Sequence, residues 1–174
     1  MKYLVKFVVV TFFLLICTHT FAEQKIVVLD LKFVLNNSKA GKGAQDFLKK
    51  SLNDNVKKFS DMEQKLKKEE SDLLTKKTIL NKEEYTKRSD LLRKKVIDYQ
   101  SQRRTAFDKI TTQRADSREA LINKIEPILN VYIKENNISL VIDKKNMLGG
   151  FPEYDITKII VEKLNKELPS LNLK

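Results

Sequence analysis

Residues 44–126 contain neither glycine nor proline, and this uninterrupted interval constrains the fold of the 174-residue chain more than any other feature. It consists mainly of Lys, Glu, Asp, Gln, Leu and Arg, most of which favour helix. Both flanks differ from it, because residues 26–29 form a short apolar run and residues 138–143 partly alternate, as strands do. The two predicted strands can meet only if the helical interval folds back on itself.

The sequence offers one place for such a reversal. Asn81 can cap the start of a second helix, with Glu84 three residues later as in a capping box. We therefore predict one helix from about residue 38 to residue 78 and another from about residue 82 to residue 126. Together they form an arm (38–126) with its tip near residues 78–82.

Both predicted helices carry apolar residues at seven-residue intervals, which is the pattern of a coiled-coil seam. This row consists of Leu52, Phe59, Leu66, Leu73 and Leu80 in the first helix and Tyr85, Leu92, Tyr99 and Ala106 in the second. The companion row is half polar, since Val56 is followed at the same spacing by Glu63, Glu70 and Lys77. The pattern predicts a thin antiparallel hairpin that reaches roughly 50–65 Å at 1.5 Å per residue.

The distal half of this arm contains the candidate binding residues. The apolar candidates lie off the seam rows and are Leu74, Ile79, Leu91 and Ile97. They either widen the seam or form an apolar surface for a partner. Residues 75–104 also hold ten basic and four acidic residues, whereas residues 44–74 and 105–126 are each neutral. The basic candidates are Lys76, Lys77, Lys87, Arg88, Arg93, Lys94 and Lys95. Such a region is either a solvated face or a binding surface for an acidic partner.

Residues 1–22 have the layout of a secretory signal peptide. Two lysines precede the apolar run 7–17, and small residues lead to a predicted cleavage between Ala22 and Glu23. An uncleaved membrane anchor is the alternative, although the run is shorter than the roughly 20 apolar residues that span a bilayer. Lipid attachment at Cys17 is a second alternative, but Ile16 occupies the preceding position, where lipoprotein signals have a small residue.

Cleavage would change the chemistry available to the mature chain. The net charge would fall from +11 to +9, and the only histidine and only cysteine would be lost. Thiol and histidine nucleophiles, and zinc sites built from His or Cys, would be excluded. Gly41-Lys42-Gly43 lacks the spacing of a phosphate-binding loop and is expected to be a helix entry. We predict no enzymatic activity, no cofactor and no metal, and the few interleaved aromatic residues argue against a nucleic-acid partner.

The remaining segments, 23–37 and 127–174, are expected to form a small body that contains the strands. Its apolar strand residues are Ile26, Val28, Ile138, Leu140 and Ile142, with the last three on one face. Pro127 is expected to start a separate turn of helix, which Asn136-Asn137 ends. Asp155 can cap a final helix whose apolar stripe is Ile156, Ile159, Ile160, Leu164 and Leu168.

The two ends of the chain resemble the Skp/OmpH family of periplasmic chaperones. Residues 25–31 and 34–42 resemble the opening of that family, and residues 140–143, 155–157 and 160–165 resemble its close. The resemblance implies an α+β, mostly α, fold in which strands from three chains form a small β body with three arms. The five strand residues named above would then belong to the trimer body.

The resemblance also implies a function. The implied function is that of an ATP-independent periplasmic holdase. Such a protein binds unfolded outer-membrane β-barrel proteins between its arms and so prevents their aggregation. Two other interpretations remain open: a structural coiled-coil spacer, and a protein of the cell envelope that binds anionic membranes through its basic tips. Anionic lipid or lipopolysaccharide is accordingly a further partner to consider.

Overall fold

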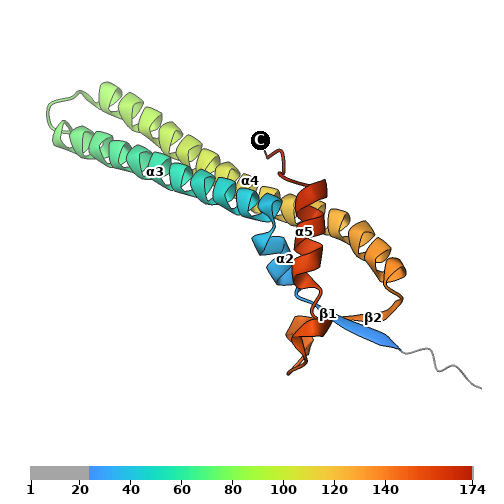
Figure 1. Cartoon of the computed structure of the whole chain (residues 1–174). Helices are drawn as coiled ribbons and strands as arrows, with labels where there is room; N and C mark the ends of the chain where they lie inside the picture. Colours follow the sequence, from blue (N-terminus) through green and yellow to red (C-terminus); the bar gives the residue numbers. More distant parts are fainter. Residues whose placement is uncertain (1–23, 174) are drawn as a thin grey trace, which may run out of the picture.

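The computed structural model describes residues 24–173, so the predicted signal 1–22 and the cleavage site Ala22–Glu23 lie outside the described residues. Its elements in order are β1 (Lys25–Leu29), α2 (Leu31–Asn37), α3 (Lys39–Thr75), α4 (Lys82–Glu135), β2 (Ile138–Asp143), η1 (Lys144–Asn146), η2 (Pro152–Tyr154) and α5 (Thr157–Glu167). Helices α3 and α4 form a long hairpin, and the other elements gather at its root (Figure 1). The predicted α+β, mostly helical, architecture is confirmed.

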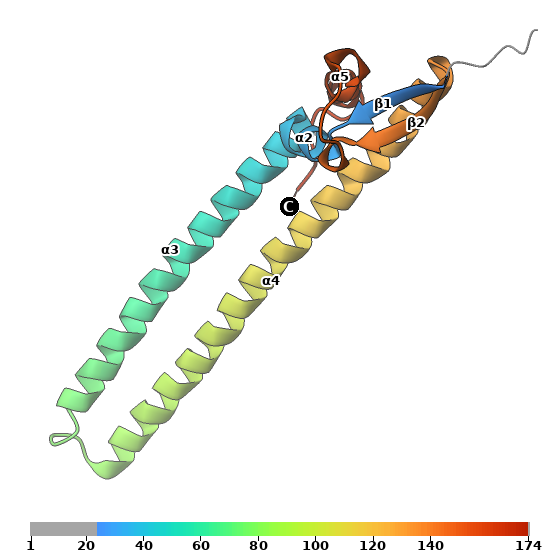
Figure 2. The ribbon, with the colours of Figure 1, turned by 90° about the horizontal axis from the view of Figure 1, so that it is seen from below.

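The arm is an antiparallel pair of unequal helices (Figure 2). Helix α3 has 37 residues and α4 has 54, which correspond to about 55 Å and 80 Å at 1.5 Å per residue. The chain reverses between Thr75 and Lys82, and the predicted cap is confirmed because the Glu84 N–H donates to Asn81 Oδ1 at 2.8 Å. The first helix ends three residues earlier than predicted.

Helix α4 does not break at Pro127, so the prediction of a separate turn there was wrong. Proline removes one backbone donor and crowds the preceding turn, which usually kinks a helix. Here Ile125 and Ile128, on either side of it, are both buried in the core. We attribute the continuity to this packing, and α4 ends as predicted at Asn136, followed by Asn137 in the left-handed region with φ of 52°.

A sharp corner joins α2 to α3, and the short helix α2 was not predicted. Asp30 caps α2 by accepting from the Phe33 N–H at 2.7 Å, and Ser38 caps α3 by accepting from the Gly41 N–H at 3.1 Å. The corner brings Gly41 against the end of α2 so closely that a Cβ there would overlap the Leu35 carbonyl oxygen. Only glycine permits this approach.

Strands β1 and β2 form a parallel pair, so the predicted meeting of the two ends of the chain is confirmed. Val27 and Leu29 of β1 face the hydrophobic core, whereas Ile26 of β1 and Leu140 of β2 are opposite each other and exposed. The register shifts at one end, because Lys25 pairs with Ile138 and Ile26 pairs with Leu140. This bulge turns Ile138 into the core and away from Leu140. The prediction that Ile138, Leu140 and Ile142 share one face of the strand was therefore wrong.

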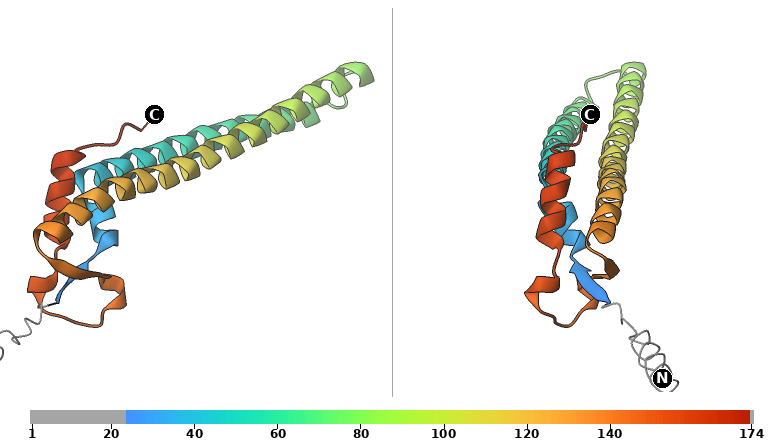
Figure 3. Two further views of the ribbon diagram at one scale, coloured as in Figure 1. Left: turned by 90° about the vertical axis from the view of Figure 1, so that its right-hand side faces the viewer. Right: turned by 45° about the vertical axis from the view of Figure 1, so that its right-hand side comes forward.

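Helix α5 closes the body beside α2 and the root of α4 (Figure 3). Its Ile160 and Leu164 are fully buried in one cluster with residues of β1, α2 and α4, as the predicted stripe requires, although Ile159 is 39% exposed. Two long-range hydrogen bonds reinforce this contact. The Asp30 N–H donates to Thr157 Oγ1 at 2.8 Å, and the Lys39 N–H donates to Asn165 Oδ1 at 2.7 Å.

Asp155 ties the start of α5 to the end of β2. Its carboxylate accepts from the Thr157 N–H at 2.9 Å and from Lys144 Nζ at 2.6 Å. Partial burial raises the pKa of Asp155, but the bonds from Lys144 and Thr157 outweigh it, so the pKa lies below its ordinary value of 3.8. Its contribution to stability is therefore complete above that value and is lost as the pH falls through the lowered pKa.

We expect Asp155→Asn to lower the free energy of unfolding at pH 7 by about 1 kcal/mol, because it removes the ion pair with Lys144. The loss should shrink as the pH falls from 3.8 through the lowered pKa of Asp155, since the wild-type carboxylate becomes neutral over that interval. Urea unfolding at several pH values measures the difference. Asp61→Asn, on the exposed arm, controls for net charge, and an equal, pH-independent loss in both variants would contradict the prediction.

Candidate functional site

Aromatic side chains pack the two arm helices together near the middle of the arm. Phe59 of α3 is 2% exposed. Its ring lies 6.0 Å from that of Tyr99 and 6.1 Å from that of Phe107. The predicted seam row is therefore the inward row at this level. The sequence pattern did not assign Phe107 to the seam, because the predicted seven-residue row contains its neighbour Ala106. In the structure α4 is oriented so that the Phe107 ring, too, lies beside Phe59.

Towards the tip the seam opens into two hollows. Leu73 and Leu92 line both of them, and the larger, of about 460 Å³, is also lined by Leu74, Tyr85 and Val96. The smaller, of about 220 Å³, is lined by Leu91 and by charged side chains. Glu63 and Glu70 of the half-polar row also line the larger hollow. Polar residues at seam positions pack less closely than apolar ones, which explains the loose distal seam.

The four predicted apolar candidates are exposed rather than enclosed in the seam. The exposed fractions are 58% for Leu74, 81% for Ile79, 52% for Leu91 and 59% for Ile97. Leu74 and Leu91 border different hollows, whereas Ile79 lies in the turn between the helices. The structure thus leaves apolar side chains around the distal arm instead of gathering them into one pocket. Such a surface can make many small contacts but encloses no ligand.

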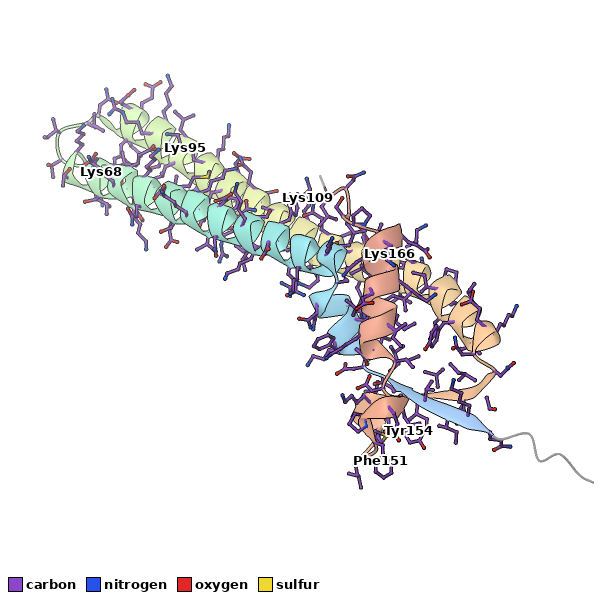
Figure 4. The ribbon with its side chains drawn as sticks, viewed as in Figure 1. Lys68, Lys95, Lys109, Phe151, Tyr154 and Lys166 are labelled. Atoms are coloured by element: carbon purple, nitrogen blue, oxygen red, sulfur yellow. The ribbon has the colours of Figure 1, made fainter. Side chains whose placement is uncertain are left out.

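The predicted basic candidates are all exposed, but three of them have acidic partners. Arg88 pairs with Glu84 at 2.8 Å, Arg93 with Asp90 at 2.9 Å and Lys95 with Glu69 at 2.6 Å. The last pair joins α4 to α3 across the arm. Figure 4 shows Lys95 on the distal half of the arm. The other four, Lys76, Lys77, Lys87 and Lys94, have no ion pair within residues 24–173. They are the cations left for an acidic partner.

Two acidic groups of the arm have lowered pKa values. The hydrogen bond and charge of Lys67 lower the pKa of Glu63, and those of Arg88 lower the pKa of Glu84. Both carboxylates are on the surface and stay ionised at neutral pH, so neither has the raised pKa of a general acid. No group of three potential metal ligands occurs in the described part of the chain.

A second candidate surface lies on the body. Ile26 is 41% exposed and Leu140 is 52% exposed, whereas Val28 and Ile138 are already buried within the chain and Ile142 is half-buried. Only part of the predicted strand set is therefore available to another copy. Strand β2 pairs with β1 on one side, and its other edge makes no backbone hydrogen bond among residues 24–173. An unpaired edge beside exposed apolar residues favours pairing with another chain.

A third exposed apolar group lies in the loop before α5 and was not singled out from the sequence. Leu148 is fully exposed, and the rings of Phe151 and Tyr154 pack edge to face with centroids 6.4 Å apart. Figure 4 shows these two aromatic residues at the end of the body away from the arm tip. Two adjacent glycines, at 149 and 150, precede Phe151, and no sequence pattern indicates that this group is exposed. No helix within residues 24–173 is long and apolar enough to cross a membrane.

Comparison with known proteins agrees with this architecture. A Skp-like protein from Pseudomonas aeruginosa is 24% identical over 166 residues, which cover 95% of this chain and 99% of that protein. The fold is similar to the crystal structure of a proposed outer membrane chaperone (OmpH-like) from Caulobacter crescentus, with a TM-score of 0.80, 16% identity and coverage of 90% of this chain and 93% of that one. The family model for outer membrane protein (OmpH-like) matches residues 25–164, from the first strand to the last helix. The chain therefore belongs to the OmpH-like family of outer membrane proteins.

Proposed function

We propose that the protein is an ATP-independent holdase of the periplasm that binds unfolded outer-membrane β-barrel proteins between its arms. The observation that carries the proposal is the distal arm, where exposed apolar side chains lie among lysines without an ion pair in residues 24–173, and where the two hollows of the seam are open to solvent. A folded ligand needs a shaped site, whereas an unfolded chain needs many weak contacts over a large area. The chaperone role is supported by the similar OmpH-like structure from Caulobacter crescentus, which is described as an outer membrane chaperone.

We further propose that the protein acts as a homotrimer, whose body joins the strand pairs of three copies. The unpaired edge of β2 and the exposed pair Ile26 and Leu140 support this assembly. Three arms would then surround one cavity, and several weak contacts from different arms would act together on one client. Light scattering by the mature protein tests the assembly, and a monomeric mass would contradict it.

The basic arm should accelerate capture of acidic clients through long-range attraction, which salt screens. Reversing the unpaired lysines Lys77, Lys87 and Lys94 to Glu should slow capture about tenfold or more at low salt. The ion pairs of Arg88, Arg93 and Lys95 stay intact in this variant. Stopped-flow fluorescence with a urea-denatured, acidic β-barrel protein measures the rate.

The matched control carries the same charge change on the neutral part of α3, as Lys50→Glu, Lys57→Glu and Lys65→Glu. These lysines are exposed and lie nearer the body. Capture by the control should slow much less. Equal rates for the two variants would show that total charge matters and that its position on the distal arm does not.

Two rivals are separated by direct tests. A structural spacer would not keep a denatured β-barrel protein soluble at one client per trimer, whereas the proposed holdase should. A protein that uses its basic tip on anionic lipid or lipopolysaccharide should sediment with such vesicles through Ile79 and the neighbouring lysines. Vesicle binding without client binding would favour that rival over the holdase.

A further inference from the structure

A groove of about 990 Å³ lies at the root of the arm. None of the candidate binding residues of the distal arm lines it. It forms where α2, the first part of α3 and the middle of α4 meet the end of β2. Its apolar floor consists of Leu31, Leu35, Ala44, Leu48, Leu52 and Leu121. Gly41 and Leu52 both line it, so it extends about 16 Å along α3 at 1.5 Å per residue.

The rim of the groove is strongly basic. Six basic and two acidic side chains line it, which gives a net charge of +4. Both acids are engaged, since Asp30 accepts from the Phe33 N–H and Asp143 accepts from the Lys145 N–H. Lys144 and Lys145 are paired with Asp155 and Asp143, respectively.

Four cations of the rim remain without an ion pair among residues 24–173: Lys32, Lys49, Arg114 and Arg118. Like charges around one groove repel each other, and no acid within residues 24–173 forms an ion pair with any of these four. An apolar floor with such a rim is complementary to a ligand that is both apolar and anionic.

The positions of these cations distinguish between anionic ligands. Lys32 lies in the first turn of α2 at the body end, whereas Lys49 and Arg114 lie farther along the arm, with Arg118 one turn nearer the body. A fatty acid or a phospholipid carries its charge at one end and would leave the other cations unpaired. An extended polypeptide advances about 3.3 Å per residue, so roughly five residues span the groove with acidic and apolar side chains interspersed.

We propose that this groove binds a short extended segment of polypeptide that contains both acidic and apolar residues. The inference rests on the proposed function, because the segment would belong to an unfolded client. It adds a second, more localised contact at the root of the arm to the diffuse contacts of the distal half. A client segment seated there would hold the chain close to the body while the distal arms contact the rest of it.

The test uses the full mature protein and a fluorescein-labelled peptide of about twelve residues in which glutamate alternates with leucine and valine. Fluorescence anisotropy should show that Arg114→Glu with Arg118→Glu weakens binding about tenfold or more. The control pair Lys109→Glu with Lys124→Glu has the same charge change on the same helix, and neither lysine lines the groove. It should change the affinity less than about threefold. A peptide with glutamine in place of glutamate should bind wild type weakly.

Each other outcome overturns the proposal. Equal losses in the two pairs would show general attraction to a basic protein. A change in oligomeric mass confined to Arg114→Glu with Arg118→Glu would show that a second copy covers the groove. Binding to phosphatidylglycerol vesicles that this pair alone abolishes, with no peptide bound by wild type, would identify lipid as the occupant. If circular dichroism shows that this pair does not fold, Lys32→Glu with Lys49→Glu carries the same expectations.

The proposed function and this inference can fail separately. A wild-type protein that does not keep a denatured β-barrel protein soluble would overturn the holdase proposal, whatever the peptide does. A wild-type protein that does so, while the groove variant binds the acidic peptide unchanged, would overturn the groove alone.

Discussion

Replacing Leu140 with glutamate should convert the proposed trimer to monomers and abolish most of the proposed ability to keep a client soluble. Leu140 is half-exposed on β2 and lies opposite the exposed Ile26. In the proposed trimer, three copies of this position come together in an apolar interior. Three buried carboxylates there would each cost several kcal/mol without a partner. Light scattering should give one third of the wild-type mass.

The helical content of this variant should stay unchanged, because Leu140 is not part of the core of a single chain. Ile97→Glu is the matched control, since Ile97 is similarly exposed but lies on the arm. It should keep the trimer mass. A trimeric Leu140→Glu protein with full client protection would contradict the placement of this strand face at the interface.

The second large effect is expected at the corner between α2 and α3. Gly41→Ala should lower the free energy of unfolding by about 3 kcal/mol, because the added Cβ overlaps the Leu35 carbonyl oxygen and lies 2.9 Å from Ser38 Oγ. Relief of that overlap would have to move α2 away from the start of α3, where Ala40 and Val34 are fully buried. Chemical denaturation of the purified variant measures the loss.

Gly43, two residues later, is the matched control. A Cβ there meets nothing within 4 Å, and the residue lies inside helix α3. Gly43→Ala should therefore stabilise the protein by about 0.5–1 kcal/mol, since alanine loses less backbone freedom in a helix. The same chemical change is thus expected to have opposite signs at the two positions. Destabilisation of equal size at both would indicate that helix entry, rather than the contact with Leu35, governs the effect.

Much of the architecture could be predicted from the sequence because it depends on local patterns. The absence of glycine and proline over residues 44–126 specifies long helices, and the seven-residue apolar row specifies which faces meet. Asn81 specifies where the second helix starts, since its side chain caps the backbone of Glu84. Strand β2 was predicted with its actual bounds, because its apolar alternation is bounded by asparagine and lysine pairs.

The candidate site was predictable in composition but not in detail. The four apolar candidates are exposed because they lie off the seam rows, and this can be read from spacing alone. Spacing alone does not show which cations lack an ion pair, because Lys95 meets Glu69 only through the register of two separate helices. The distinction changes the choice of residues for the charge-reversal experiment.

The sequence by itself thus determined the helical hairpin, its tip, its basic distal half and the pairing of the two ends of the chain, since each depends on periodicity or composition. Only the tertiary structure decided the rest. Burial of Ile125 and Ile128 accompanies the uninterrupted course of α4 past Pro127, and the bulge in β2 separates Ile138 from Leu140. The groove at the root of the arm arises because α2 and α3 meet α4 and the end of β2, which are distant from them in the sequence. Such features depend on contacts between segments, and no local pattern records them.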